Sequence, residues 1–312
     1  MAMDKEAHGM KKFIQMMICV GSSMFLLPIF IVKLSGIEVG CEGAITSMVQ
    51  TQVKEEEDII NEETLVGILA KEIPYTYELE AIKAQAVVAR SYMARRILGV
   101  QSKGAIVGYT VDEMKQLWGE ERYGSIYNTY KEAIQTTKGK LILYDNQPIE
   151  ALYHEASSGK TRDAKSVYKT DIPYLKGVES SIDKISKQVK YTKVEVADFI
   201  KEKYSNLIVS TDTLENQIQI VAKDEAGYVS VIQIGNITLT GEEIKNMLKL
   251  PSCAFKIYNS EESLIFDVKG VGTGIGLSQN GANELAKQGM GYEDIIKYYY
   301  TGVTIENYEV QK

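Results

Sequence analysis

The chain has 312 residues, of which 45% are hydrophobic and 25% are charged, and its formal net charge at pH 7 is −7. This length allows one or two domains with a proper hydrophobic core. Because basic residues are not in excess, the composition argues against nucleic acid as a partner.

The N-terminal residues predict a membrane anchor. Lys11 and Lys12 precede an uncharged stretch, residues 13–32, which is long enough to cross a bilayer as a helix. Lysines before the stretch and acidic residues at 55–58 predict a cytoplasmic tail at residues 1–12 and an extracytoplasmic remainder. A cleaved signal peptide is the alternative, although its apolar core would be shorter and a small-residue cleavage site is missing. The predicted location is the cell membrane, with a single pass.

A linker is predicted at residues 33–57, followed by one folded domain at residues 58–306 and a short tail at 307–312. The domain opens with helical spacing of apolar residues that stops at Pro74. A second amphipathic pattern predicts a helix over about residues 78–98, and its many alanines indicate close packing against another element.

The middle of the domain predicts both strands and helices. Residues 125–140 are helical in pattern, and residues 141–144 and 149–154 predict a β-hairpin around Asp145-Asn146. A small inserted α/β subdomain is predicted at residues 185–225. Because helices and strands are interleaved without a regular βαβ order, the predicted fold class is α+β with mostly antiparallel strands.

The segment "KGVGTGIGLSQNGA" places glycine at every second position from Gly270 to Gly276. It does not fit the dinucleotide pattern Gly-x-Gly-x-x-Gly in any register, and no Gly-Lys-Ser/Thr closes it as a P-loop. A strand interrupted by glycine indicates that another backbone or a ligand comes close. The segment is therefore interpreted as a backbone-lined wall of a ligand groove.

Few residues could supply nucleophilic or metal chemistry. The two histidines are His8, in the predicted cytoplasmic tail, and His154. A serine hydrolase would have to use His154 with the neighbouring serines, and its usual Gly-x-Ser-x-Gly elbow is missing. With one usable histidine and three widely spaced cysteines, a zinc site made by the protein is not expected.

The best candidate for a catalytic group is Glu72. It follows an apolar helical stretch and precedes Ile73-Pro74, so it is expected at a helix end beside hydrophobic neighbours. A partly buried carboxyl group keeps its proton more readily and can serve as a general acid. Glu80 is a second candidate, but its place in the first turn of the next helix has an ordinary explanation in the helix dipole.

Three segments together resemble the stage II sporulation protein D and amidase-enhancer family. They are "AKEIPYTYELEAIKAQAVVARSYMARR", "ALYHEASSGKTRDAKSVY" and "GTGIGLSQNGANELAKQG", in the family's order. The resemblance covers about residues 57–306. It implies a peptidoglycan lytic transglycosylase that needs no cofactor and cleaves the MurNAc–GlcNAc bond without water, leaving a 1,6-anhydro sugar.

The resemblance also implies the site residues. The family's catalytic glutamate before Met-Pro corresponds to Glu72. Six further residues correspond to groove-lining or orienting positions: Lys83, Gln85, Arg90, His154, Ser278 and Gln279. The implied partners are peptide-stripped glycan strands, a cell-wall amidase and other membrane proteins of the engulfment machinery.

Two departures from the family pattern bear on catalysis and metal binding. The family's histidine in Gly-His-Gly is Thr273 here, and the cysteines that bind zinc in some members have no counterpart between Cys41 and Cys253. No metal is therefore expected. The alternatives are a non-catalytic glycan-binding protein that recruits or stimulates an amidase, and a membrane-anchored scaffold.

Overall fold

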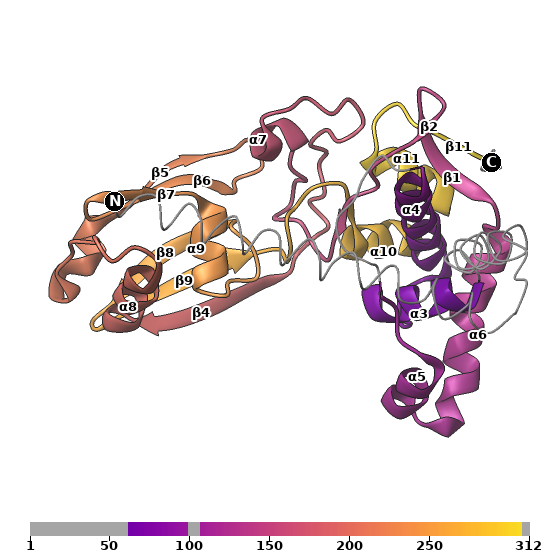
Figure 1. The fold of residues 1–312 in the computed structure, drawn as a ribbon, viewed down its shortest axis with the longest axis horizontal. Helices are drawn as coiled ribbons and strands as arrows, with labels where there is room; N and C mark the ends of the chain where they lie inside the picture. The colour runs from indigo at the N-terminus through magenta and orange to yellow at the C-terminus, as the bar shows by residue number, and fades with distance from the viewer. Residues whose placement is uncertain (1–61, 99–106, 308–312) are drawn as a thin grey trace, which may run out of the picture. The chain divides into compact units, whose positions relative to one another are not determined.

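The computed structural model describes residues 62–98 and 107–307 (Figure 1). The chain divides into two compact units, residues 1–57 and 58–312, and every described residue belongs to the second. The predicted tail, anchor and linker therefore lie outside the described residues, as do residues 308–312. Within the described ranges, none of the helices combines the length and apolar character that crossing a membrane requires.

Four helices open the described part of the chain: α3 (Glu62–Glu72), α4 (Leu79–Ile97), α5 (Val111–Trp118) and α6 (Glu120–Thr136). The predicted helices before Pro74 and over 78–98 are confirmed. Helix α6 begins five residues before the predicted residue 125 and ends before Gly139, which lies in the following turn.

Helix α4 is the central element of this part of the protein. It packs against α3 and α6 on one side and against α10 (Gln279–Lys287) and α11 (Tyr292–Tyr299) on the other. Its alanines divide between two hydrophobic cores, with Ala81 and Ala84 in one and Ala86 and Ala89 in the other. Small side chains all round the helix allow both sets of neighbours to approach closely, as the alanine content predicts.

The predicted hairpin is confirmed at its turn and corrected in its second strand. Strand β1 (Lys140–Tyr144) pairs antiparallel with β2 (Gln147–Pro148) and with β11 (Thr304–Asn307). Asp145 and Asn146 have φ angles of 50° and 59°, as a two-residue type I′ turn requires. Beyond Pro148, Ile149 still donates its N–H to the Ile142 carbonyl oxygen at 3.1 Å. The Ile142 N–H donates to Ser91 Oγ at 2.8 Å instead, so the second strand ends at Pro148.

A second part of the described chain contains two three-stranded antiparallel sheets. One sheet has the order β4 (Ser186–Thr192), β9 (Ser263–Lys269), β8 (Phe255–Ser260), and the other β5 (Ile218–Lys223), β6 (Val229–Ile234), β7 (Ile237–Leu239). Helices α8 (Lys193–Lys203) and α9 (Gly241–Met247) and the 3-10 helix η1 (Thr211–Gln217) accompany them. Both α-helices start with a Thr-x-x-Glu capping box.

These two sheets share one hydrophobic core, formed by apolar residues between Val196 and Val268. Along β9, Leu264, Phe266 and Val268 alternate with less buried residues, so one face of the strand supplies the core. Helices and mostly antiparallel strands thus make up the described chain, and the α+β prediction is confirmed. The inserted subdomain predicted at residues 185–225 stays a prediction.

The glycine run forms a tight protein contact. Gly270, Gly272, Gly274 and Gly276 all have positive φ angles, between 72° and 98°. A Cβ atom at Gly276 would lie 1.9 Å from the Leu152 carbonyl oxygen, so a side chain has no space there. The run meets backbone and side chains of this same protein, and the interpretation of these glycines as the wall of an open groove is corrected.

The run leads into the single parallel strand pair among the described named strands. Strand β3 (Tyr153–His154) lies beside β10 (Leu277–Ser278), with Tyr153 opposite Leu277 and His154 opposite Ser278. The short helix α7 (Ala164–Tyr168) follows β3. The pairing brings the second and third family-like segments together, although they are more than a hundred residues apart in sequence.

Candidate active site

Glu72 is the last residue of α3, and two hydrogen bonds fix the backbone around it. Gln279 Nε2 donates to the Glu72 carbonyl oxygen at 2.9 Å, and the Tyr130 hydroxyl donates to the Ile73 carbonyl oxygen at 2.6 Å. Both carbonyls belong to the end of α3, where the backbone has no intrahelical donor. The residue predicted to be catalytic is therefore held from α6 and from the start of α10.

A cavity of about 510 Å³ opens beside Glu72. Its volume lies in the range of small-molecule and sugar sites. The lining residues come from α3, from α4, from position 107 and from the segment that leads into β3. They are Lys71, Glu72, Tyr92, Val107, Ala151, Leu152 and Tyr153. Among these described lining residues, Glu72 supplies the one carboxylate, and two tyrosines and a lysine supply the other polar groups.

Tyr153 contacts Glu72 directly. Burial raises the pKa of the Tyr153 phenol, and so do the Glu72 charge, a side-chain hydrogen bond to Glu72 and the neighbouring Tyr92. The phenol therefore keeps its proton and donates it in a hydrogen bond to the Glu72 carboxylate. Sequence reasoning missed this residue, although Tyr153 stands beside His154 in the family-like "YHEASSG" segment.

Lys83 is held by Glu80 on the same helix. The Lys83 Nζ atom lies 2.7 Å from Glu80 Oε1, and the lysine side chain is 14% exposed. Glu80 Oε2 also accepts the backbone N–H of Tyr292 at 2.9 Å. Glu80 thus joins α4 to the first residue of α11, which gives it a structural role and leaves Glu72 as the carboxylate in the cavity.

Arg90 is buried where α4 meets the end of α6. Its Nη1 atom donates to the carbonyl oxygens of Thr137, at 2.8 Å, and Lys140, at 3.3 Å, and Nη2 donates to that of Ile134 at 3.3 Å. A cation at the carbonyl end of a helix is stabilised by the helix dipole. Arg90 therefore holds α4 against the end of α6, and it is not among the residues that line the Glu72 cavity.

Gln85 is fully buried on α4, and its amide nitrogen and oxygen have no hydrogen-bond partner among the described residues. A buried amide normally costs stability unless a partner or a bound water satisfies it. Gln85 is thus placed in the protein interior rather than on a surface that faces solvent.

His154 is also inside the protein. Its Nδ1 atom lies 3.1 Å from the Ile275 carbonyl oxygen, and only 4% of the residue is exposed. Burial lowers the pKa of the imidazole to about 4, so the ring is neutral at pH 7 and Nδ1 donates to the carbonyl. Together with Gln85, it is a predicted site residue that the fold places away from the Glu72 cavity lining.

A buried aspartate that sequence reasoning missed organises the start of α10. Asp183 Oδ2 accepts hydrogen bonds from the hydroxyl groups of Ser157, at 2.6 Å, Ser180, at 2.9 Å, and Ser278, at 2.7 Å. Oδ1 accepts from Asn280 Nδ2 at 2.9 Å. The signal in the sequence was only the polar segment "ESSID", which resembles any solvated loop.

Ser278 and Gln279 therefore share one structural unit. The Ser278 hydroxyl caps α10 by accepting the Gly281 N–H at 3.1 Å, while it donates to Asp183. Gln279 follows immediately and reaches the Glu72 carbonyl. The fold thus brings Glu72, Ser278 and Gln279 together, and a continuous path of contacts leads from Asp183 to the end of α3.

Thr273, where the family pattern has histidine, is exposed. Its carbonyl oxygen accepts a hydrogen bond from Arg162 Nη1 at 3.1 Å, and its hydroxyl oxygen lies 3.4 Å from the Ile275 nitrogen. Thr273 is not among the residues that line the Glu72 cavity. Over residues 62–98 and 107–307, no group of three or more histidine, cysteine, aspartate or glutamate side chains is arranged to hold a metal ion.

Comparison with known proteins agrees with the resemblance of the three segments. A family model described as "Stage II sporulation protein" matches residues 49–144. The chain is 35% identical over 261 residues to stage II sporulation protein D of Bacillus subtilis (strain 168), an alignment that covers 80% of this chain and 75% of that protein. It is 33% identical over 261 residues to stage II sporulation protein D of Bacillus amyloliquefaciens, with the same coverage.

A more distant relative carries a different name. The amidase enhancer of Bacillus subtilis (strain 168) is 26% identical in an alignment of length 297 that covers 78% of this chain and 40% of that protein. The two sporulation proteins match across most of their length and at higher identity. The chain therefore belongs to the stage II sporulation protein D family.

Proposed function

We propose that this protein is a peptidoglycan lytic transglycosylase in which Glu72 is the single acid and base. The observation that carries the proposal is the cavity of about 510 Å³ in which the Glu72 carboxylate is hydrogen-bonded by Tyr153. Membership of the sporulation family supports a role in cell-wall remodelling during sporulation.

The proposed reaction uses one carboxyl group twice. Protonated Glu72 gives its proton to the oxygen of the MurNAc–GlcNAc bond as that bond breaks. The resulting carboxylate then accepts the proton of the 6-hydroxyl group of the same MurNAc, whose oxygen attacks the anomeric carbon and closes a 1,6-anhydro ring. Because the nucleophile comes from the substrate, a second carboxylate is unnecessary, in contrast to the paired carboxylates of glycoside hydrolases.

The surrounding residues fit roles in this reaction. Tyr153 donates a hydrogen bond to Glu72 and fixes the direction in which the carboxyl group points. Gln279 and Tyr130 hold the backbone on either side of the Glu72–Ile73 peptide bond. Lys71 and Tyr92 line the cavity and are available to the sugar hydroxyl and carboxyl groups.

Activity on peptide-stripped glycan tests the proposal. The full chain is incubated with denuded glycan strands, and the products are analysed by mass spectrometry for 1,6-anhydro-MurNAc ends. A Glu72→Gln variant keeps the shape but loses the exchangeable carboxyl proton, and it should form these products at least about 100-fold more slowly. Glu121→Gln, at an exposed position on α6, is the matched control and should retain activity. Equal product formation by the Glu72→Gln variant would remove Glu72 from the mechanism.

The second candidate function is a non-catalytic glycan-binding protein that recruits or stimulates a cell-wall amidase. The similarity to a protein named amidase enhancer favours it. It predicts that the chain pellets with glycan and accelerates a purified amidase while anhydro products are absent.

On either function, we propose a single membrane anchor at residues 13–32. This anchor leaves the folded domain outside the cell, where it acts together with other engulfment proteins.

A further inference from the structure

Two further cavities share a wall at the turn that follows β5. Lys223 and Ala226 line both of them, and neither cavity shares a lining residue with the one beside Glu72. One measures about 450 Å³ and the other about 220 Å³. They are rich in lysine although the whole chain carries a net charge of −7. A ligand held here would contact a different set of residues from the one that lines the proposed catalytic cavity.

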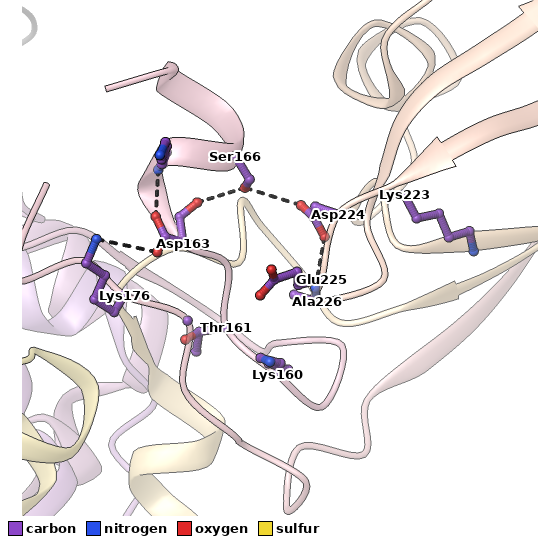
Figure 2. A pocket seen from close by; sticks show the side chains of 11 residues that line it. Lys160, Thr161, Asp163, Ser166, Lys176, Lys223, Asp224, Glu225 and Ala226 are labelled. Atoms are coloured by element: carbon purple, nitrogen blue, oxygen red, sulfur yellow. Dashed lines mark hydrogen bonds and ion pairs between the residues drawn. The ribbon is translucent and has the colours of Figure 1, made fainter. Parts of the chain in front are cut away.

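The charges of the larger cavity are mostly paired within the protein. Figure 2 shows Asp163 between α7 and Lys176, whose Nζ atom lies 3.6 Å from Asp163 Oδ2. Asp224 forms a salt bridge of 2.7 Å with the buried Arg162. Lys223 points away from this network in the same view, towards the neighbouring strands. The larger cavity therefore has little uncompensated charge.

The smaller cavity has an excess of positive charge. Lys223 comes from the end of β5, Lys256 from β8 and Lys269 from the end of β9, and Asp267 is the one acidic residue that lines it. Three lysines against one aspartate leave two positive charges. Asp267 stands opposite Lys256 in the β8–β9 register, so it compensates that lysine most closely.

The three lysines also lack direct ion-pair partners among the described residues. None of the three forms a salt bridge with any described residue. Lys223 Nζ donates to the Phe255 carbonyl oxygen at 3.0 Å, which uses one of its three N–H groups. Burial and the repulsion of Lys256 and Lys269 lower the pKa of Lys223, so the cations are close enough to repel each other.

We propose that the cavity lined by Lys223, Lys256 and Lys269 binds a phosphate group of a soluble phosphate ester or phosphodiester polymer. Ammonium groups are compact point charges that suit phosphate oxygens. The lysines approach from three different strands. The two charged oxygens and the two ester oxygens of a tetrahedral phosphodiester point in four directions, whereas the two oxygens of a carboxylate lie in one plane. The site is a concave pocket of about 220 Å³, which favours a protruding phosphate group over the flat surface of a bilayer.

Binding to a defined phosphodiester polymer tests the proposal. The full chain is titrated with soluble poly(glycerol phosphate) by isothermal titration calorimetry at low ionic strength. Hyaluronate, a polymer with carboxylates and no phosphate, and monomeric short-chain phosphatidylglycerol are the comparison ligands. The Lys256→Ala/Lys269→Ala variant should bind poly(glycerol phosphate) at least about tenfold more weakly, because two charged hydrogen-bond donors are lost.

The matched control removes the same charge elsewhere on the same sheet. Lys187 and Lys190 are on the exposed strand β4, outside the cavity lining. If local contacts rather than net charge hold the phosphate, the Lys187→Ala/Lys190→Ala variant should change the affinity for poly(glycerol phosphate) less than about twofold. The proposal is overturned if the two double variants lose affinity equally, or if hyaluronate binds as tightly as poly(glycerol phosphate). Binding to phosphatidylglycerol alone would overturn it in favour of a lipid headgroup.

Discussion

Replacing Arg162 with methionine should destabilise the fold strongly. The Arg162 side chain is 4% exposed and lies between two carboxylates, with Nε 2.7 Å from Asp224 Oδ2 and Nη1 2.9 Å from Glu242 Oε1. Its guanidinium carbon also stands 4.7 Å from the centre of the Tyr228 ring. Its Nη1 atom also donates to the carbonyl oxygen of Thr273, which lies within the glycine run, at 3.1 Å. Methionine keeps much of the side-chain volume but removes the charge and every donor.

The size of the effect depends on what the two carboxylates keep. Glu242 retains Lys245 at 2.7 Å and is 32% exposed, so water and the lysine compensate most of its loss. The Asp224 side chain is 8% exposed and would keep no salt bridge with a described residue. It retains the backbone N–H groups of Ala226, at 3.1 Å, and Tyr228, at 3.0 Å, and a long hydrogen bond from the Ser166 hydroxyl at 3.4 Å. An isolated buried charge left by removing its partner costs about 3–5 kcal/mol, so we expect a loss of unfolding free energy in that range.

Urea unfolding of the full chain, followed by circular dichroism, measures the change. The variant Arg162→Met/Asp224→Asn removes the stranded charge and should recover at least about 1 kcal/mol relative to Arg162→Met. A loss below about 1 kcal/mol for Arg162→Met, or a double variant less stable than the single one, would refute the reasoning that Asp224 depends on this guanidinium.

Three further predictions concern the site and the segments that support it. Burial lowers the pKa of His154 from 6.5 to about 4. Between pH 4 and 6.5 the unfolded chain therefore binds a proton that the folded chain does not. The free energy of unfolding should fall by up to about 3 kcal/mol as the pH drops from 6.5 to 4. A His154→Asn variant should lose this part of the pH dependence in unfolding titrations, and an unchanged slope would contradict a neutral buried imidazole. Tyr153→Phe removes the hydrogen bond to Glu72 and should lower the rate of anhydro-product formation about 10- to 100-fold with little change in KM, whereas a change confined to KM would indicate a role in binding alone. Gly276→Ala should lower the free energy of unfolding by more than about 3 kcal/mol, because it adds a Cβ atom against the Leu152 carbonyl oxygen at a residue with a φ angle of 75°. Gly124→Ala, at a position on α6 where a Cβ atom meets no other atom, should raise it by about 1 kcal/mol or less.

The local structure of this protein could be predicted well from its sequence. The end of α3 at Glu72 follows from Pro74, and the course of α4 follows from apolar residues spaced three and four apart. The hairpin turn at Asp145-Asn146 follows from the tolerance of these residues for positive φ angles. Such features depend on neighbouring residues along the chain, and neighbouring residues are what a sequence displays.

The catalytic candidate was accessible to sequence reasoning in the same way. Glu72 stands at a helix end beside apolar residues, and its position in the family-like segment singled it out. Its hydrogen-bond partner did not stand out, because Tyr153 is one of 20 tyrosines and follows Glu72 by 81 positions. Only the parallel pairing of β3 with β10 carries that tyrosine to the cavity wall.

The sequence by itself thus determined the family and the α+β class, and it singled out Glu72 as the candidate acid. Tertiary structure decided how the other predicted site residues are used: His154 and Gln85 are buried, Arg90 bonds helix carbonyls, and Gln279 reaches Glu72. It also decided that the glycines make room for the protein's own backbone. The physical reason is that burial, close approach and pKa depend on atoms far away in the sequence, which meet only when the chain is folded.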